Sequence, residues 1–209
     1  VDLRTVLDKD CELNILTARD EKGLAVLRHT ASHVMAEAVQ TLFPEAKVAI
    51  GPSIDTGFYY DFECQSFARD DLDAIEKEMK KIIKKGAKIE RFTKSREDAI
   101  AFFKEKNEPY KVELIEDLPE GEEISFYSQG DWVDLCAGPH LMSTKGIKAF
   151  KLLSSSGAYW RGDENKHMLT RIYGTAYATK DELKEHLTQL EEAKKRDHNK
   201  LGREMKLFT

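Results

Sequence analysis

The strongest periodic pattern in the chain lies near its N-terminus and predicts one long helix. Apolar side chains recur at spacings of three and four residues, as one face of an α-helix requires. They are Leu24, Leu27, Ala31, Val34, Ala38 and Leu42. The helix is expected to begin at Gly23 and to end before Pro44, because proline cannot continue a helix. One side of this helix should be buried in a core, so the opposite side is free to present functional side chains.

The remaining patterns mix strands and helices without the regular alternation of a parallel α/β fold. Strands are predicted at residues 12–17, 47–50, 58–62 and 87–92, and short strands separated by glycine turns at 124–177. Helices are predicted from a cap at Asp70 or Asp71 up to Gly86, at 95–106 with Ser95 as its cap, and at 180–205. We therefore expect an α+β fold with a long charged helix at its C-terminal end.

The composition is that of an ordinary globular protein. Of the 209 residues, 41% are hydrophobic and 34% charged, which suits one sizeable domain with an appendage, or two small domains. No run of eighteen apolar residues occurs, so no membrane span is predicted. Three cysteines and the lack of a secretory signal favour a reducing, cytoplasmic location. The missing initial Met suggests a piece of a longer chain.

Basic residues gather in two segments although the net charge is −5. The first holds Lys77, Lys80, Lys81, Lys84, Lys85, Lys88, Arg91 and Lys94, and the second Lys194, Lys195, Arg196, Lys200, Arg203 and Lys206. Runs of this kind are most often solvated helix faces. They could also contact the phosphates of a nucleic acid. Charge alone leaves both interpretations open.

Two histidines stand four residues apart on the first predicted helix. His29 and His33 should lie one above the other on a helical face, away from the apolar stripe. A single histidine in such a place is usually an ordinary core or surface residue. A pair at this spacing is a candidate for catalysis or for metal binding.

A second cluster of reactive residues follows much later in the chain. Asp134, Cys136 and His140 lie in a stretch whose Gly138 and Pro139 exclude a regular helix, so the thiol and the imidazole should converge through a turn. Together with the two early histidines they form a plausible set of four zinc ligands. A buried cysteine with an ordinary loop histidine, and a purely structural zinc site, stay open as alternatives.

These two clusters resemble those of the editing domain of threonyl-tRNA synthetases, a domain similar to that of the alanyl enzymes. The matching stretches are residues 29–33 (HTASH), 50–61 (IGPSIDTGFYYD), 136–140 (CAGPH), 157–163 (GAYWRGD) and 171–176 (RIYGTA). Five ordered stretches over nearly the whole chain make the resemblance specific. The Gly138-Pro139 pair favours the threonyl branch, since alanyl relatives usually have Gly-Thr there.

The resemblance implies an arrangement of three parts. Residues 1–22 would be the tail of an N-terminal β-grasp domain, 23–178 the editing domain, and 179–209 a linker helix leading to a class II catalytic domain that this chain lacks. The editing domain would have an antiparallel sheet with packed helices around a cleft. The ATP-binding motifs of the parent enzyme are absent, so the chain should not make aminoacyl-tRNA by itself.

The resemblance also implies an activity, which is hydrolysis of the ester in seryl-tRNA(Thr). One methyl group distinguishes threonine from serine by only about 10- to 200-fold, so a second site must remove the wrong product. The partners would be the acceptor end of tRNA(Thr) and its seryl-adenosine moiety. The parent enzyme would join threonine to tRNA(Thr) with ATP.

Seven residues carry roles over from the family. His29 would lie nearest the attacking water, His33, Cys136 and His140 would shape the pocket, and Lys111 would stabilise charge. Asp134 would bind the serine hydroxyl or amino group, and Tyr60 would line the pocket. Taken without the resemblance, Lys111, Asp134 and Tyr60 read as a surface lysine, a loop carboxylate and a core aromatic.

The resemblance does not require a metal for this activity. Zinc is possible, and its ligands would be His29, His33, Cys136 and His140. Two competing functions remain at this stage: a zinc-stabilised tRNA-binding module without catalysis, and editing of the alanyl type.

Overall fold

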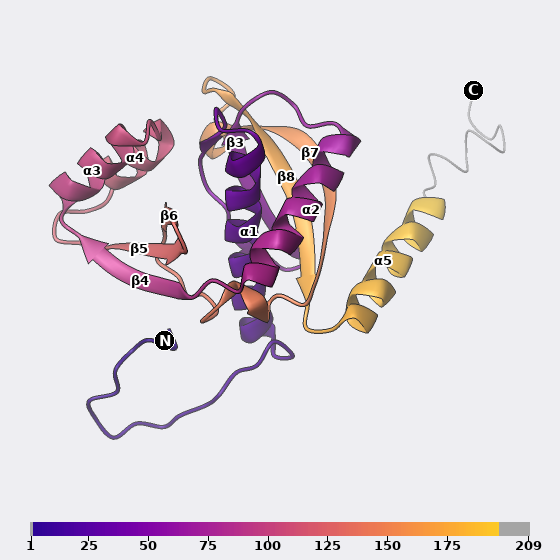
Figure 1. Ribbon diagram of the computed structural model, residues 1–209, viewed down its shortest axis with the longest axis horizontal. Coiled ribbons are helices and arrows are strands. Elements are labelled where there is room, and N and C mark those ends of the chain that lie inside the picture. The colour runs from indigo at the N-terminus through magenta and orange to yellow at the C-terminus, as the bar shows by residue number, and fades with distance from the viewer. Residues whose placement is uncertain (1, 197–209) are drawn as a thin grey trace.

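Strand pairing divides the protein into two antiparallel sheets, as Figure 1 shows for the computed structural model. The structure describes residues 2–196. The larger sheet has the order β1-β3-β8-β7, with β2 also paired to β3, and the smaller has the order β4-β5-β6. The α+β prediction is therefore confirmed. None of the described helices is long and apolar enough to span a membrane.

The larger sheet and two helices form what we call the large lobe. Its elements are α1 (Glu21–Leu42), β1 (Lys47–Val48), β2 (Ser53–Ile54), β3 (Gly57–Glu63), α2 (Arg69–Lys85), β7 (Ala149–Tyr159) and β8 (Met168–Tyr177). Helix α1 packs on both β3 and β8 and on α2. Gly86 ends α2 in the left-handed conformation at φ +69°, where glycine avoids the strain of a side chain.

Helix α1 is buried on nearly all sides, which corrects the prediction of a single buried face. Besides the apolar stripe, Thr30, Ser32 and His33 are all buried. The reason is that the sheet, α2 and the loop after Cys136 cover different sides of the helix. Polar side chains are tolerated there because they find partners: the Ser32 hydroxyl lies 2.8 Å from the His29 carbonyl and 2.6 Å from the Gly51 carbonyl, either of which can accept its one proton.

The smaller sheet and two short helices form the small lobe. Its elements are β4 (Ile89–Lys94), α3 (Arg96–Glu105), α4 (Pro109–Glu116), β5 (Ile124–Gln129) and β6 (Trp132–Leu135). Ser95 caps α3 by accepting from the Asp98 N–H, as its position before the helix predicted. The sequence analysis missed α4, which has Pro109 at its first turn, where a proline is well tolerated.

The remaining segments link or flank the lobes. They are η1 (Thr144–Gly146), η2 (Trp160–Gly162) and α5 (Lys180–Lys195). The predicted strand at 12–17 was wrong: these residues are exposed and irregular, with no strand beside them in the described part of the chain. Thr179 caps α5 by accepting from the Glu182 N–H. The end of the predicted C-terminal helix, at 197–205, lies outside the described residues.

Candidate active site

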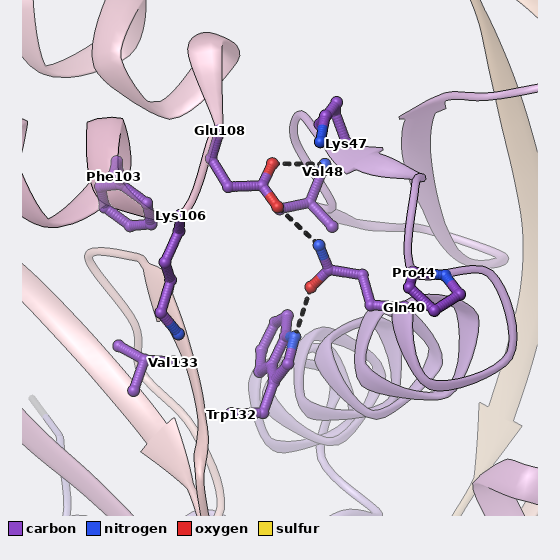
Figure 2. A pocket seen from close by; sticks show the side chains of 9 residues that line it. All are labelled: Gln40, Pro44, Lys47, Val48, Phe103, Lys106, Glu108, Trp132 and Val133. Atoms are coloured by element: carbon purple, nitrogen blue, oxygen red, sulfur yellow. Dashed lines mark hydrogen bonds between the residues drawn. The ribbon is translucent and has the colours of Figure 1, made fainter.

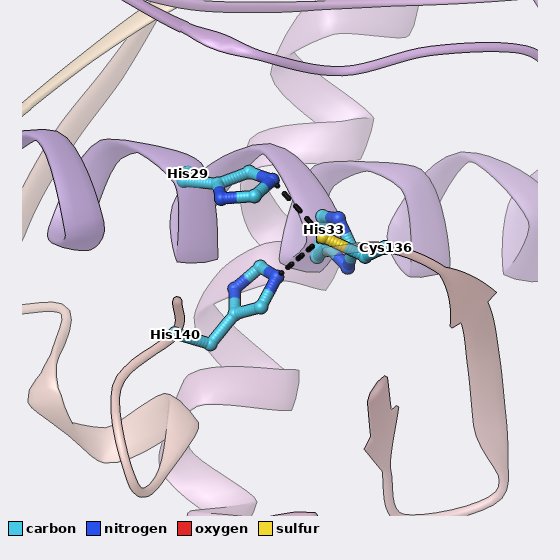
Figure 3. A group of neighbouring side chains, drawn as sticks. All are labelled: His29, His33, Cys136 and His140. Atoms are coloured by element: carbon cyan, nitrogen blue, oxygen red, sulfur yellow. Dashed lines mark hydrogen bonds between the residues drawn. The ribbon is translucent and has the colours of Figure 1, made fainter. Parts of the chain in front are cut away.

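The two clusters of histidine and cysteine meet where the lobes join. His29 and His33 come from α1, and Cys136 and His140 from the loop that follows β6, as Figure 3 shows. The Cys136 Sγ lies 3.4 Å from His29 Nε2 and 3.2 Å from His140 Nε2. One nitrogen or sulfur of each of the four side chains lies within 4.8 Å of the others.

The loop between Cys136 and His140 is shaped by Gly138. Its φ is +73°, and a Cβ there would lie 2.1 Å from the Tyr127 hydroxyl, so only glycine fits this turn. The Gly138 N–H donates to the Cys136 sulfur at 3.2 Å. The loop therefore fixes the thiol with its own backbone before it returns His140 toward α1.

A second, ionic group lies directly behind the histidines. The Lys111 ammonium is 2.6 Å from Asp134 Oδ1 and donates to the Tyr60 hydroxyl at 2.9 Å. Tyr60 in turn donates to Asp134 Oδ2 at 2.6 Å, and His33 Nε2 is 3.6 Å from that same oxygen. Lys111, Asp134 and Tyr60 are all buried, so the bland interpretation of Lys111 as a surface lysine is wrong.

Burial keeps the imidazoles neutral near pH 7. It lowers the pKa of His29, and it holds the pKa values of His33 and His140 well below the ordinary range, with the neighbouring histidines adding to the effect. Burial also raises the pKa of the Cys136 thiol to about 12. At neutral pH the site therefore offers unprotonated imidazole nitrogens and a protonated thiol, and Cys136 is unsuited to act as a thiolate nucleophile.

The four-residue cluster fits zinc in its donor types. Three imidazoles and one thiol form a common zinc ligand set. Zinc bonds of about 2.0–2.3 Å place tetrahedral ligands roughly 3.3–3.6 Å apart. The sulfur–nitrogen distance of 3.4 Å to His29 falls in this range, and that of 3.2 Å to His140 is slightly shorter. The candidate ligand atoms of all four side chains lie within 4.8 Å of one another, which is a wider spread than tetrahedral zinc requires, so at least one ring would have to move inward. A bound zinc would also deprotonate Cys136.

A chain of hydrogen bonds supports the site from the side of the small lobe (Figure 2). The Trp132 indole N–H donates to Gln40, the Gln40 amide donates to the Glu108 carboxylate, and the Val48 N–H donates to the other carboxylate oxygen. These residues line a cavity of about 250 Å³ that the histidine cluster does not line. Because Trp132 packs edge-on against His33 at 5.6 Å between ring centroids, this chain also steadies the imidazole.

Two residues of this neighbourhood were missed by the sequence analysis. Trp132 lies two residues before Asp134 on β6, and Thr30 lies between the two histidines on α1. The signal for Trp132 was its position on the same strand face as Asp134. Thr30 gave no signal, because its partner His140 is distant in sequence.

The first basic segment lies mainly on the exposed side of α2. Lys77, Lys80, Lys84 and Lys85 are exposed, as a solvated helix face predicts. Two lysines of the segment are paired with nearby carboxylates, Lys81 with Glu78 and Lys88 with Glu90. In the second basic segment Lys194, Lys195 and Arg196 are exposed, and Lys200, Arg203 and Lys206 lie outside the described residues.

Comparison with known proteins gives the same family that the sequence stretches indicated. Residues 124–173 match the family described as threonyl and alanyl tRNA synthetase second additional domain. The threonine–tRNA ligase of Acetivibrio thermocellus is 62% identical over 99% of this chain, and that of Clostridium botulinum is 64% identical over 100%.

The chain is a homologue of the threonine–tRNA ligases. It spans about a third of the length of these relatives, 33% in both cases. The match to the second additional domain covers β5, β6, all of β7 and the first part of β8 up to Tyr173, including Asp134, Cys136 and His140. The two histidines of α1 lie outside that match, but inside the region that is similar to the ligases.

Proposed function

We propose that this threonine–tRNA ligase homologue hydrolyses the ester that joins serine to the terminal ribose of tRNA(Thr). The observation that carries the proposal is the meeting of His29, His33, Cys136 and His140 beside the buried pair of Lys111 and Asp134. Ester hydrolysis needs a base for water, a stabilised oxyanion and a protonated leaving oxygen. Neutral imidazoles and a buried ammonium can supply all three.

His29 is the residue we assign to the attacking water. It is the only one of the three clustered histidines that is not fully buried, so water can reach it. Burial lowers its pKa, which keeps the ring unprotonated and able to accept a proton near pH 7. His33 and His140 are enclosed, and we assign them to shaping the pocket and holding the thiol.

Lys111, Asp134 and Tyr60 would serve the substrate and the developing charge. The Lys111 ammonium would stabilise the oxyanion, either directly or through a water. Asp134 would accept from the amino or hydroxyl group of serine. Both of its oxygens already have partners in Lys111 and Tyr60, so the substrate would enter at the looser 3.6 Å contact with His33. Tyr60 would line the pocket.

The similarity to threonine–tRNA ligases supports a division of the chain into three parts within a longer protein. Residues 1–22 would end a β-grasp domain, 23–178 would be the editing domain, and 179–209 would lead toward a class II catalytic domain. The whole protein would then join threonine to tRNA(Thr) with ATP in the cytoplasm. The partner of the present chain would be the acceptor end of tRNA(Thr).

The proposal is tested by presenting the chain with tRNA(Thr) charged either with serine or with threonine. Serine should be released and threonine retained, because an editing site accepts the smaller product. The same assay with alanine tRNA charged with serine tests editing of the alanyl type. If neither seryl-tRNA is hydrolysed faster than by buffer, the proposed function is wrong.

A zinc-stabilised tRNA-binding module is the second candidate, favoured by the donor types of the four-residue cluster. We propose that hydrolysis needs no metal, so treatment with a chelator should leave deacylation unchanged. The module instead predicts one zinc per chain and tRNA binding without deacylation. It also predicts that Cys136→Ala unfolds the chain, because structural zinc stabilises a fold directly.

A further inference from the structure

The buried hydroxyl of Thr30 connects α1 to the loop that carries His140. Its oxygen lies 2.9 Å from the Val26 carbonyl, 3.2 Å from His140 Nδ1 and 3.0 Å from the Leu141 N–H, which donates to it. Thr30 is fully buried, so no water competes for these positions. A hydroxyl has one proton and two lone pairs, so three partners use all of its capacity.

The Val26 carbonyl decides where the hydroxyl proton lies. A carbonyl can only accept, so a Thr30 proton directed elsewhere would leave two oxygens facing each other at 2.9 Å with no hydrogen between them. The proton therefore goes to Val26. The Thr30 oxygen must then accept from the His140 ring, which requires the proton of the neutral ring to be on Nδ1.

This tautomer determines what His140 offers to Cys136. With the proton on Nδ1, the Nε2 atom has a free lone pair directed at the sulfur, 3.2 Å away. The thiol has one proton to donate, and His29 Nε2 at 3.4 Å is the competing acceptor. A thiol that donates to His140 leaves the lone pair of His29 free for water.

We infer that Thr30 is a positioning residue that holds His140 in the Nδ1–H tautomer, so that the Cys136 thiol donates to His140 and not to His29. The catalytic consequence rests on the proposed function, because it makes His29 the base. The assignment of the His140 tautomer does not depend on the proposed function. The two parts can therefore be tested separately.

The tautomer is tested by nitrogen-15 NMR of the histidine rings in the full chain, freed of metal by a chelator. The His140 signal is identified by its loss in His140→Gln. It should show Nδ1–H in the unsubstituted chain and in Thr30→Ser, which keeps the hydroxyl. In Thr30→Val it should move partly or fully to Nε2–H. An Nε2–H ring in the unsubstituted chain, or an unchanged ring in Thr30→Val, would overturn the inference.

The catalytic part is tested by seryl-tRNA(Thr) deacylation with the same variants. Loss of a group that orients a metal-bound histidine typically costs about 10- to 100-fold in activity, and we expect the kcat of Thr30→Val to fall by about the same factor with KM within about 2-fold. Thr30→Ser should restore most of kcat. The matched control is Thr175→Val, since Thr175 is equally buried and donates to the Thr56 carbonyl away from the site.

The outcomes separate the two claims. A changed tautomer with unchanged kcat overturns the catalytic role of Thr30 and leaves the proposed function standing. A loss of kcat as large in Thr175→Val as in Thr30→Val would mean that general destabilisation is responsible, which overturns the positioning role. No deacylation by the unsubstituted chain, with the expected tautomer present, means that the proposed function has failed and the ring geometry has not.

Discussion

The large lobe packs around an extended core, whereas the small lobe has a much smaller one. The large core joins α1, α2, β3 and β8. The small core has five buried apolar residues, Ala99, Phe103, Ile115, Ile124 and Phe126. Both lobes supply the site: His29, His33 and Tyr60 come from the large one, and Lys111 and Asp134 from the small one. A site at such a junction depends on polar contacts that hold the two lobes in a fixed position relative to each other.

The difference teaches that the two sets of site residues have different tasks in stability. The histidines stand on a helix that the large core would hold in place without them. Lys111 and Asp134 are themselves part of what ties the small lobe to Tyr60 of the large lobe. Substitutions of the α1 histidines should therefore lower activity with little effect on stability. Substitutions of Lys111 or Asp134 should lower both.

The largest effect is expected from His29→Ala. Loss of a general base lowers the rate about 100- to 10,000-fold, while unfolding in urea should change little because the ring is partly exposed. Deacylation of seryl-tRNA(Thr) measures the first and the urea midpoint the second. His167→Ala, at an exposed histidine outside the cluster, is the control and should alter neither. A fall in the urea midpoint large enough to account for the lost deacylation would contradict the separation of activity from stability at the histidines.

The next largest effect is expected from Lys111→Met. It leaves the Asp134 carboxylate buried without its cation, which typically costs about 3–5 kcal/mol. The free energy of unfolding in urea measures this. The double variant with Asp134→Asn should regain part of the loss, since it removes the unpaired charge. Lys166→Met breaks a more exposed pair with Glu113 and should cost less than about 1 kcal/mol. Equal losses in both single variants would contradict the junction role.

Acid should destabilise the protein through the buried imidazoles. The folded-state pKa values of His33 and His140 lie well below the ordinary value. Stability is then fully present above the unfolded pKa of about 6.5, and it falls as the pH drops below that value because the unfolded chain binds more protons. The slope should rise toward about 1.4 kcal/mol per pH unit for each histidine as the pH falls to about one unit below that value. Urea unfolding between pH 7.5 and 5.5 measures it, and His33→Gln should reduce the slope.

The smallest effect is expected from Ser95→Ala, which removes the N-cap of α3. Loss of such a cap costs about 1 kcal/mol. Because α3 covers the small core, amide hydrogen exchange should speed up in β4 and β5 and stay unchanged in β3 and β8. Thr179→Ala removes the cap of α5, which has no fully buried residue, and should change exchange in neither sheet. Uniform acceleration in both sheets would mean that the lobes unfold as one unit.

Local signals predicted much of the fold because they act within a few residues. The periodicity of residues 24–42, the Ser95 cap and the Gly86 stop each gave an element close to its observed bounds. The strand prediction at 12–17 failed because a strand-like sequence forms no strand without a neighbour to pair with. The helix after Pro109 was missed because only eight residues form it, too few for a clear periodic pattern.

The candidate site also has features that the sequence predicted and features that only the structure revealed. Residue types and spacing singled out His29, His33, Cys136 and His140, and resemblance to the family added Lys111, Asp134 and Tyr60. The spacing did not predict that α1 is buried all round, that Lys111 is enclosed beside Asp134, or that Trp132 and Thr30 support the rings. These facts depend on residues far apart in the chain.

By itself, the sequence determined the helices with strong periodicity and caps, the α+β class, the reactive residue types and the homology to threonine–tRNA ligases. Only the tertiary structure decided which side chains are buried and which protons they hold. The physical reason is that propensity and capping act locally, whereas burial and pKa depend on which distant segments pack together. The 3.2 Å contact between Thr30 and His140, 110 residues apart, has no counterpart in local sequence.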